Sequence, residues 1–135
     1  AQHRRRVPLV IKIAPDNSEE ELQAMGEAFV QHGIDGVCVG NTTLSREGVQ
    51  GLPKFDEQGG LSGAPLKPIA NQALATMIQT LKGRIPIIGV GGINSAADAL
   101  EKQQLGADLV QIYSGLIYQG PGLIGDIARV WPKAI

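Results

Sequence analysis

Four short apolar runs, each followed by a stretch with helical spacing, constrain the fold of this chain more than any other feature. The runs occupy residues 7–13, 36–40, 85–90 and 109–112. Each run is apolar almost throughout, as expected of parallel strands that are covered on both faces. Parallel strands need a crossover between them, and a helix is the usual one. The sequence therefore predicts an α/β chain of four βα units.

The intervening stretches predict where the helices begin and end. Ser18 is a suitable N-cap for a first helix that ends at Gly33, and further helices are expected at 71–81, from 95 to about 104, and near 123–130, with a short helical turn before the last. Residues 44–68 contain five glycines and three prolines, too many for regular structure. A connection of that length inside a compact domain is usually a functional lid or a binding loop.

Two arrangements fit four βα units. Four units in 135 residues amount to about 34 residues each, so eight would fill the roughly 250 residues of a complete (β/α)₈ barrel. An open doubly wound sheet of four strands fits the count equally well. The ends of the last two strands favour the barrel, because Gly91 and Gly92 follow one of them and Ser114 and Gly115 follow the other.

These two strand ends have the composition of a phosphate site. Glycine has no Cβ, so a ligand can approach its amide closely, and a following helix start offers unpaired N–H groups. (β/α)₈ barrels bind phosphate in the loops after their last two strands. We therefore expect residues 1–135 to form one domain, the C-terminal half of a TIM barrel and a fragment of the whole, which pairs with the missing half or with a second copy.

Composition excludes several classes of function. A formal net charge of −1 argues against nucleic acid as a partner. A single cysteine cannot form an internal disulfide, and two histidines give no metal-ligand cluster, so we expect no metal and a reducing compartment. No apolar run approaches the roughly 20 residues that span a bilayer, so we expect this chain itself to be soluble.

Five motifs, taken together and in order, resemble one family. They are KIAPD at 12–16, NTT at 41–43, GGLSGAPLK at 59–67, IIGVGGI at 87–93 and QIYSG at 111–115. This combination resembles dihydroorotate dehydrogenase, and the run on to YQGP at 118–121 favours its class 2, quinone-reducing branch. Any one of these motifs alone would be weak, because other phosphate-binding barrels contain similar glycine pairs.

The resemblance implies an activity and a set of site residues. The activity is FMN-dependent oxidation of dihydroorotate to orotate in pyrimidine biosynthesis, with quinone as acceptor, at the cytoplasmic side of the inner membrane. The implied substrate-binding residues are Asn41 and Thr42. The implied FMN-binding residues are Lys12, Gly40, Gly63, Gly92, Tyr113 and Ser114. Gly40 stands where the family usually has threonine, so a contact there would come from the backbone.

The resemblance also implies an incomplete active site. The family's catalytic base is a serine on an earlier loop, and no residue of this chain aligns with it. Ser45 and Ser62 have no histidine or aspartate partner in the sequence, and Cys38 lies inside an apolar run, where we expect it to pack in the core. We therefore expect no catalytic residue in this chain and no turnover by it alone. The alternatives are a phosphate- or flavin-binding module without catalysis, or a class 1 relative with a soluble acceptor.

Overall fold

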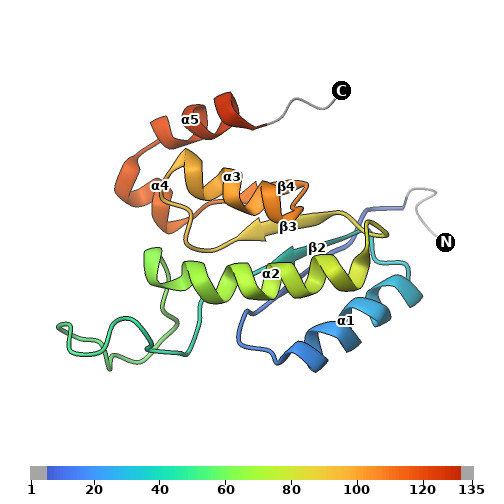
Figure 1. Ribbon diagram of the computed structural model, residues 1–135, viewed down its shortest axis with the longest axis horizontal. Coiled ribbons are helices and arrows are strands. Elements are labelled where there is room, and N and C mark those ends of the chain that lie inside the picture. Colours follow the sequence, from blue (N-terminus) through green and yellow to red (C-terminus); the bar gives the residue numbers. More distant parts are fainter. Residues whose placement is uncertain (1–5, 132–135) are drawn as a thin grey trace.

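The sheet has four parallel strands in sequence order. The computed structural model describes residues 6–131, so the two ends of the predicted 1–135 domain lie outside the described residues. The strands are β1 (Val10–Ile13), β2 (Gly36–Val39), β3 (Ile87–Val90) and β4 (Leu109–Gln111), and each pairs in parallel with the next (Figure 1). The predicted α/β order of four βα units is confirmed.

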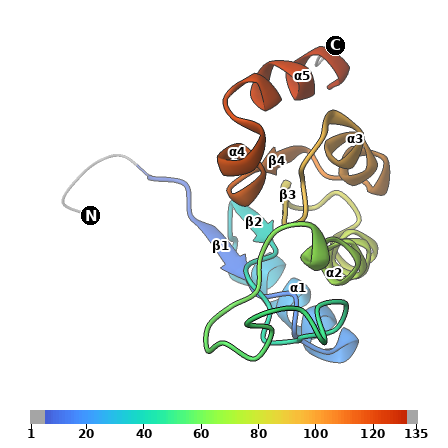
Figure 2. The same ribbon diagram turned by 90° about the vertical axis from the view of Figure 1, so that its left-hand side faces the viewer.

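Three long helices cover one face of this sheet. The helices are α1 (Glu19–Gln31), α2 (Lys67–Leu81), α3 (Ala96–Leu105), α4 (Ser114–Gln119) and α5 (Gly122–Val130), with a 3₁₀ turn η1 (Ala64–Leu66) before α2. Helices α1, α2 and α3 lie side by side on the same side of the strands, whereas α4 and α5 lie beyond β4 at one end (Figure 2). No helix within residues 6–131 is long and apolar enough to cross a bilayer.

Local sequence explains most helix boundaries. Ser18 caps α1 by accepting the Glu21 N–H, while the Glu21 carboxylate accepts the Ser18 N–H, which completes a capping box. Helix α2 begins at Lys67, four residues before the predicted start, so the irregular segment is shorter than predicted. The predicted start of this helix was wrong: Pro68 lies in the first turn of α2, where proline is well tolerated, so the glycine and proline content of residues 44–68 does not mark the helix start.

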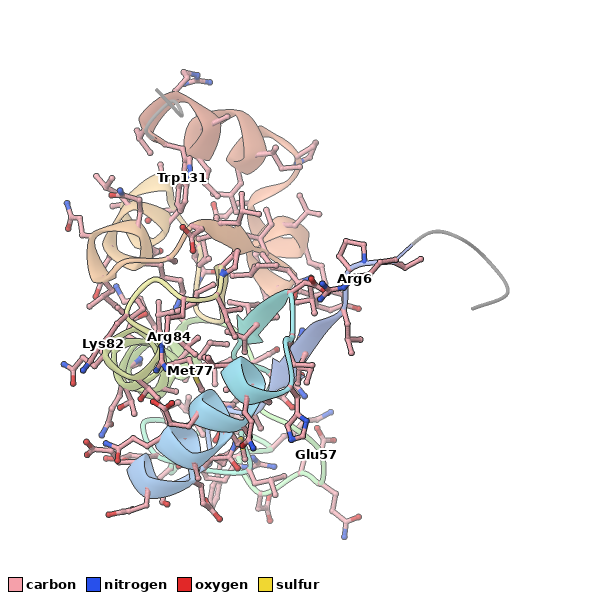
Figure 3. The ribbon with its side chains drawn as sticks, turned by 90° about the vertical axis from the view of Figure 1, so that its right-hand side faces the viewer. Arg6, Glu57, Met77, Lys82, Arg84 and Trp131 are labelled. Carbon is pink, nitrogen blue, oxygen red and sulfur yellow. The ribbon has the colours of Figure 1, made fainter. Side chains whose placement is uncertain are left out.

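The core lies between the sheet and the helices. Leu74, Met77 and Leu81 of α2 are fully buried and belong to the same apolar cluster as Val37 and Val39 of β2. Cys38 is also buried, as predicted. A second cluster joins α3 and α5 through four buried side chains, Ile93, Ala99, Leu123 and Ile127, with Trp131 packed against it (Figure 3).

Arg84, labelled in Figure 3, braces two neighbouring helices. Its guanidinium forms two hydrogen bonds to the Glu27 carboxylate of α1, the shorter at 2.7 Å, and also donates to the carbonyls of Thr80 and Leu81 at the end of α2. The hydrogen bonds from the Arg84 guanidinium lower the pKa of the Glu27 carboxylate. The carbonyls of Thr80 and Leu81, which have no acceptor role inside the helix, thereby gain a donor.

The other face of the sheet is concave. Strand register places Val10, Lys12, Cys38 and Gln111 on this face, and Lys12 Nζ lies 3.1 Å from Gln111 Oε1. Their strands are at opposite edges, three strand spacings of about 4.8 Å apart. Side chains of edge strands can meet at that separation only when the sheet curls toward them, as in a barrel wall. The curvature favours the half barrel over the open sheet.

The described residues leave the two edges of the concave face uncovered. Val10 and Leu109, at its two edges, keep 46% and 58% of their surface accessible to solvent. The strands were predicted to be covered on both faces, but on the concave face the described residues bury only central side chains, such as Cys38 and Val90, and leave the edge strands exposed. The exposed apolar face and the two free strand edges agree with the half barrel predicted from the sequence.

Candidate functional site

A cleft of about 360 Å³ opens at the carboxyl ends of the strands. This is the end of the sheet at which β/α proteins hold their ligands. The lining side chains come from all four strand ends and from the loop before α2; they are Lys12, Asn41, Thr42, Ser62, Gly63, Leu66, Val90, Gly91, Gly92, Ile93, Gln111, Ile112, Tyr113, Ser114 and Gly115. The volume is within the usual range for small-molecule sites, roughly 300–1,000 Å³.

The structure brings together seven of the eight site residues expected from the sequence. The exception is Gly40, which does not line the cleft. Its φ of +121° is in the region that favours glycine, and a Cβ at this position would overlap the Val90 carbonyl oxygen. Close approach of β2 and β3 therefore accounts for Gly40, and an FMN contact there stays a prediction.

The turn after β3 is held tightly under the start of α2. Gly92 has a φ of +73°, and a Cβ on it would lie 2.7 Å from the backbone nitrogen of Lys67. Asp98 fixes the same turn from α3, because its carboxylate accepts the Asn94 N–H at 3.0 Å and the Ser95 hydroxyl at 2.8 Å. The glycine pair is therefore pre-organised by its neighbours.

The turn after β4 lies next to the β3 turn. A Cβ on Gly115 would overlap the carbonyl oxygen of Ile93, so these two backbone segments are in direct contact. The Ser114 hydroxyl lies 2.9 Å from the Ser62 hydroxyl, which comes from the long loop. Among the described residues, the amides of Gly92 and Ser114 have no backbone acceptor. Both turns thus leave polar donors at the cleft.

Lys12 and Gln111 form the polar part of the concave face. Gln111 Oε1 accepts from Lys12 Nζ at 3.1 Å and from Cys38 Sγ at 3.5 Å. Burial raises the pKa of the Cys38 thiol, although the Lys12 charge acts in the opposite direction. Lys12 could be predicted as a site residue from the sequence, whereas the role of Gln111 could not. Only the fold brings residues 99 positions apart into contact.

Behind the glycine turn, a polar network joins α2 to α3. Lys67 Nζ lies 2.9 Å from Asp98 and 3.0 Å from Glu101, and Asn71 donates to Glu101 and accepts from Lys102 Nζ at 2.7 Å. Hydrogen bonds to Asp98 and Glu101 raise the pKa of Lys67. Burial lowers the pKa of Lys102 to about 8. This network could not be predicted from the sequence, because lysines and acids on two helices are typical of ordinary solvated faces.

The long loop is anchored at both ends. Thr43 pairs with Leu61 in an isolated bridge, and the Thr43 hydroxyl donates to the Asp16 carboxylate. The Arg46 guanidinium donates to the Glu57 and Gly59 carbonyls at 2.8 and 2.7 Å and thereby closes the loop between them. Ser62 and Gly63 leave this anchored segment directly into the cleft. The loop is therefore ordered against the site.

The two residues expected to bind substrate lie directly after β2. Asn41 and Thr42 are exposed at the cleft, so their polar groups are available to a ligand. Thr42 also packs against Gly60, where a Cβ would overlap its side chain. Within residues 6–131, neither of the two alternative serine bases is placed with a histidine: the Ser45 hydroxyl accepts the Glu47 N–H, and Ser62 contacts Ser114.

A curled parallel sheet, helices on one side and a glycine-lined cleft at the strand ends define a β/α-barrel protein with a site suited to a phosphate-bearing ligand. The sequence model of the dihydroorotate dehydrogenase family matches residues 1–134. The chain belongs to the dihydroorotate dehydrogenase family, and the resemblance seen in its motifs is confirmed.

Relatives and a solved structure agree with this assignment. Dihydroorotate dehydrogenase (quinone) of Shewanella woodyi is 53% identical over 126 residues, 93% of this chain and 37% of that protein. The same-named protein of Delftia acidovorans is 53% identical over 128 residues, 95% of this chain and 37% of its own length. The crystal structure of Eimeria tenella DHODH with ferulenol matches with a TM-score of 0.87 and 34% identity over 93% of this chain.

These matches also define how much of the relatives the chain represents. It spans 37% of the two curated relatives and 33% of the Eimeria tenella chain. The structural match confirms the predicted fold class, in which four βα units form part of a barrel.

Proposed function

We propose that this chain supplies the FMN-holding and substrate-facing part of a dihydroorotate dehydrogenase that uses quinone as electron acceptor in pyrimidine biosynthesis. The observation that carries the proposal is the cleft, which unites the glycine turns of β3 and β4 with the Lys12 ammonium. The quinone acceptor is supported by the names of the curated relatives.

The lining of the cleft fits FMN. The amides of Gly92 and Ser114 have no backbone acceptor among the described residues, and Ser114 adds a hydroxyl, so the two turns offer donors for a phosphate cradle. Apolar side chains of Leu66, Val90 and Ile112 line the rest and suit a flat ring system. Gly63 and Tyr113 complete the proposed FMN contacts.

Lys12 would act on the FMN ring, and the residues after β2 would bind the substrate. FMN, when bound, supplies a ring that accepts a hydride from the substrate. The Lys12 ammonium provides fixed positive charge at the cleft, which stabilises negative charge developing on a ring beside it. Asn41 and Thr42 offer both donors and acceptors, as recognition of the substrate's cyclic amides requires.

Other parts of the parent enzyme complete the proposal. We place the catalytic base outside this chain and expect no turnover from residues 1–135 alone. The uncovered concave face, with Val10 and Leu109 exposed, is expected to pack against the remaining barrel strands. Because quinones dissolve in the bilayer, we expect the parent enzyme to work at the cytoplasmic surface of the inner membrane.

Absorption and native mass spectrometry of the purified protein test the proposal. We expect a flavin band near about 450 nm and one FMN per chain. A colourless protein that binds inorganic phosphate through residues 91–95 and 113–115 would instead support a phosphate-binding module without flavin. Dihydroorotate-dependent dye reduction by residues 1–135 alone would contradict the expected absence of a base.

A further inference from the structure

The Lys12 ammonium is held at the cleft by a single neutral side chain. Gln111 Oε1 lies 3.1 Å from Lys12 Nζ and 3.5 Å from Cys38 Sγ, so one amide oxygen serves donors from two other strands. Both Lys12 and Gln111 line the cleft. The carbonyl end of Gln111 is thereby fixed across the concave face, although the residue is exposed.

The charge of Lys12 is left uncompensated. No carboxylate lies within ion-pair distance of Lys12 among residues 6–131. By contrast, Lys67 at the edge of the same site pairs with Asp98 at 2.9 Å and with Glu101 at 3.0 Å. An amide can accept a hydrogen bond from an ammonium without cancelling its charge.

We infer that Gln111 is a positioning residue that directs the Lys12 ammonium into the cleft and, because it is neutral, preserves the positive field there. The inference rests on the proposed function, in which this field acts on the FMN ring. Neither the hydrogen bond nor the side-chain packing requires glutamine as such. Glutamate has the same shape and could accept from both Lys12 and Cys38. The neutrality of Gln111 is therefore what separates a field-preserving role from a purely structural one.

Gln111→Glu is the decisive variant, measured through sulfite affinity and the flavin midpoint potential of the FMN-loaded protein. Sulfite adds to the flavin ring and leaves negative charge on it, so a nearby cation strengthens its binding. We expect Gln111→Glu to weaken sulfite binding at least tenfold and to make the potential more negative. Its urea-unfolding midpoint should match that of the unsubstituted protein, because the hydrogen bonds are retained.

Three further variants make the test specific. Gln79→Glu on the exposed side of α2 adds the same charge away from the cleft and should change sulfite affinity less than twofold. Gln111→Leu keeps the charge of Lys12 but removes the hydrogen bond that positions its ammonium. We therefore expect sulfite affinity to fall by an intermediate factor of about threefold. In a Lys12→Met background, the change in sulfite affinity caused by Gln111→Glu should be less than a third of the change seen with Lys12 present, because the cation through which Gln111 acts is gone.

The outcomes separate this inference from the proposed function. Gln111→Glu with unchanged sulfite affinity and potential would overturn the inference and leave FMN binding intact. So would an undiminished effect of Gln111→Glu in the Lys12→Met background, which would show that the new carboxylate acts on the flavin directly. An unsubstituted protein that holds no FMN would overturn both.

Discussion

The hydroxyl oxygens of Ser62 and Ser114 lie 2.9 Å apart and join the long loop after β2 to the end of β4. This contact spans 52 residues and closes one side of the cleft. The loop reaches the site already anchored, because Thr43 pairs with Leu61 at its base. The segment expected from its glycines and prolines to be a functional loop is therefore part of the wall of the site.

Ser62→Ala should weaken the attachment of the long loop to the end of β4. We expect the dissociation constant for FMN to rise about three- to tenfold, since one hydrogen bond of roughly 1 kcal/mol is lost. Fluorescence titration of the apoprotein with FMN measures the effect. Ser45→Ala is the matched control, because Ser45 lies in the same loop but contacts the Glu47 N–H instead of the cradle. Equal effects of both substitutions would contradict a specific role for Ser62.

Gly92→Ala should destabilise the fold strongly. Its φ is +73° and the new Cβ would lie 2.7 Å from the Lys67 nitrogen, a backbone atom that cannot move aside. We expect a loss of about 3 kcal/mol or more in urea unfolding. Gly83→Ala shares the positive φ, +76°, but meets no atom within 4 Å, so it should lose only about 1–2 kcal/mol. Similar losses at both positions would show that packing at Gly92 is unimportant.

Lys102 should make stability depend on pH. Burial lowers its pKa from 10.5 to about 8, so the unfolded chain binds more protons than the folded one between these values. The contribution of Lys102 to stability therefore rises with pH across this window, by at most about 1.4 kcal/mol per pH unit. Lys102→Met should remove that rise when urea unfolding is compared at about pH 8.5, 9.3 and 10, which all lie within the window. A variant with the same pH slope as the unsubstituted protein would contradict the prediction.

Asp98→Asn should weaken the hydrogen bonds through which the Asp98 carboxylate holds the glycine turn after β3. Burial alone would raise the pKa of Asp98, but hydrogen bonds from Lys67, the Asn94 N–H and Ser95 outweigh it and lower the pKa. The stability that this carboxylate contributes is therefore present above its ordinary pKa and lost as pH falls through the lowered one.

We expect Asp98→Asn to lower the free energy of unfolding by about 2 kcal/mol at neutral pH, with a smaller difference under acid conditions. Chemical unfolding at several pH values measures it. Asp126→Asn is the control, because Asp126 forms only an exposed pair with Arg129 and should have little effect. If the free energies of unfolding of Asp98→Asn and of the unsubstituted protein differ by the same amount at all pH values, the ionised Asp98 carboxylate does not stabilise the turn as predicted.

Much of the fold could be predicted from local pattern. The four apolar runs predicted all four strands, because a strand buried in a parallel sheet must be apolar along its whole length. The start of α2 was missed, since Pro68 is compatible with both a loop and a first helical turn. Seven of the eight expected site residues line the cleft, and Gly40 is instead explained by contact between two strands.

Local sequence specifies the order of strands and helices and the glycine turns at the ends of β3 and β4, because these depend on residues close together in the chain. Packing of the folded chain brings Gln111 to Lys12 and Ser62 to Ser114, and it buries Lys102 against Asn71. Each of these pairs joins residues at least 31 positions apart. Their contacts depend on how the sheet curls and how the helices pack, and local periodicity carries no information about either.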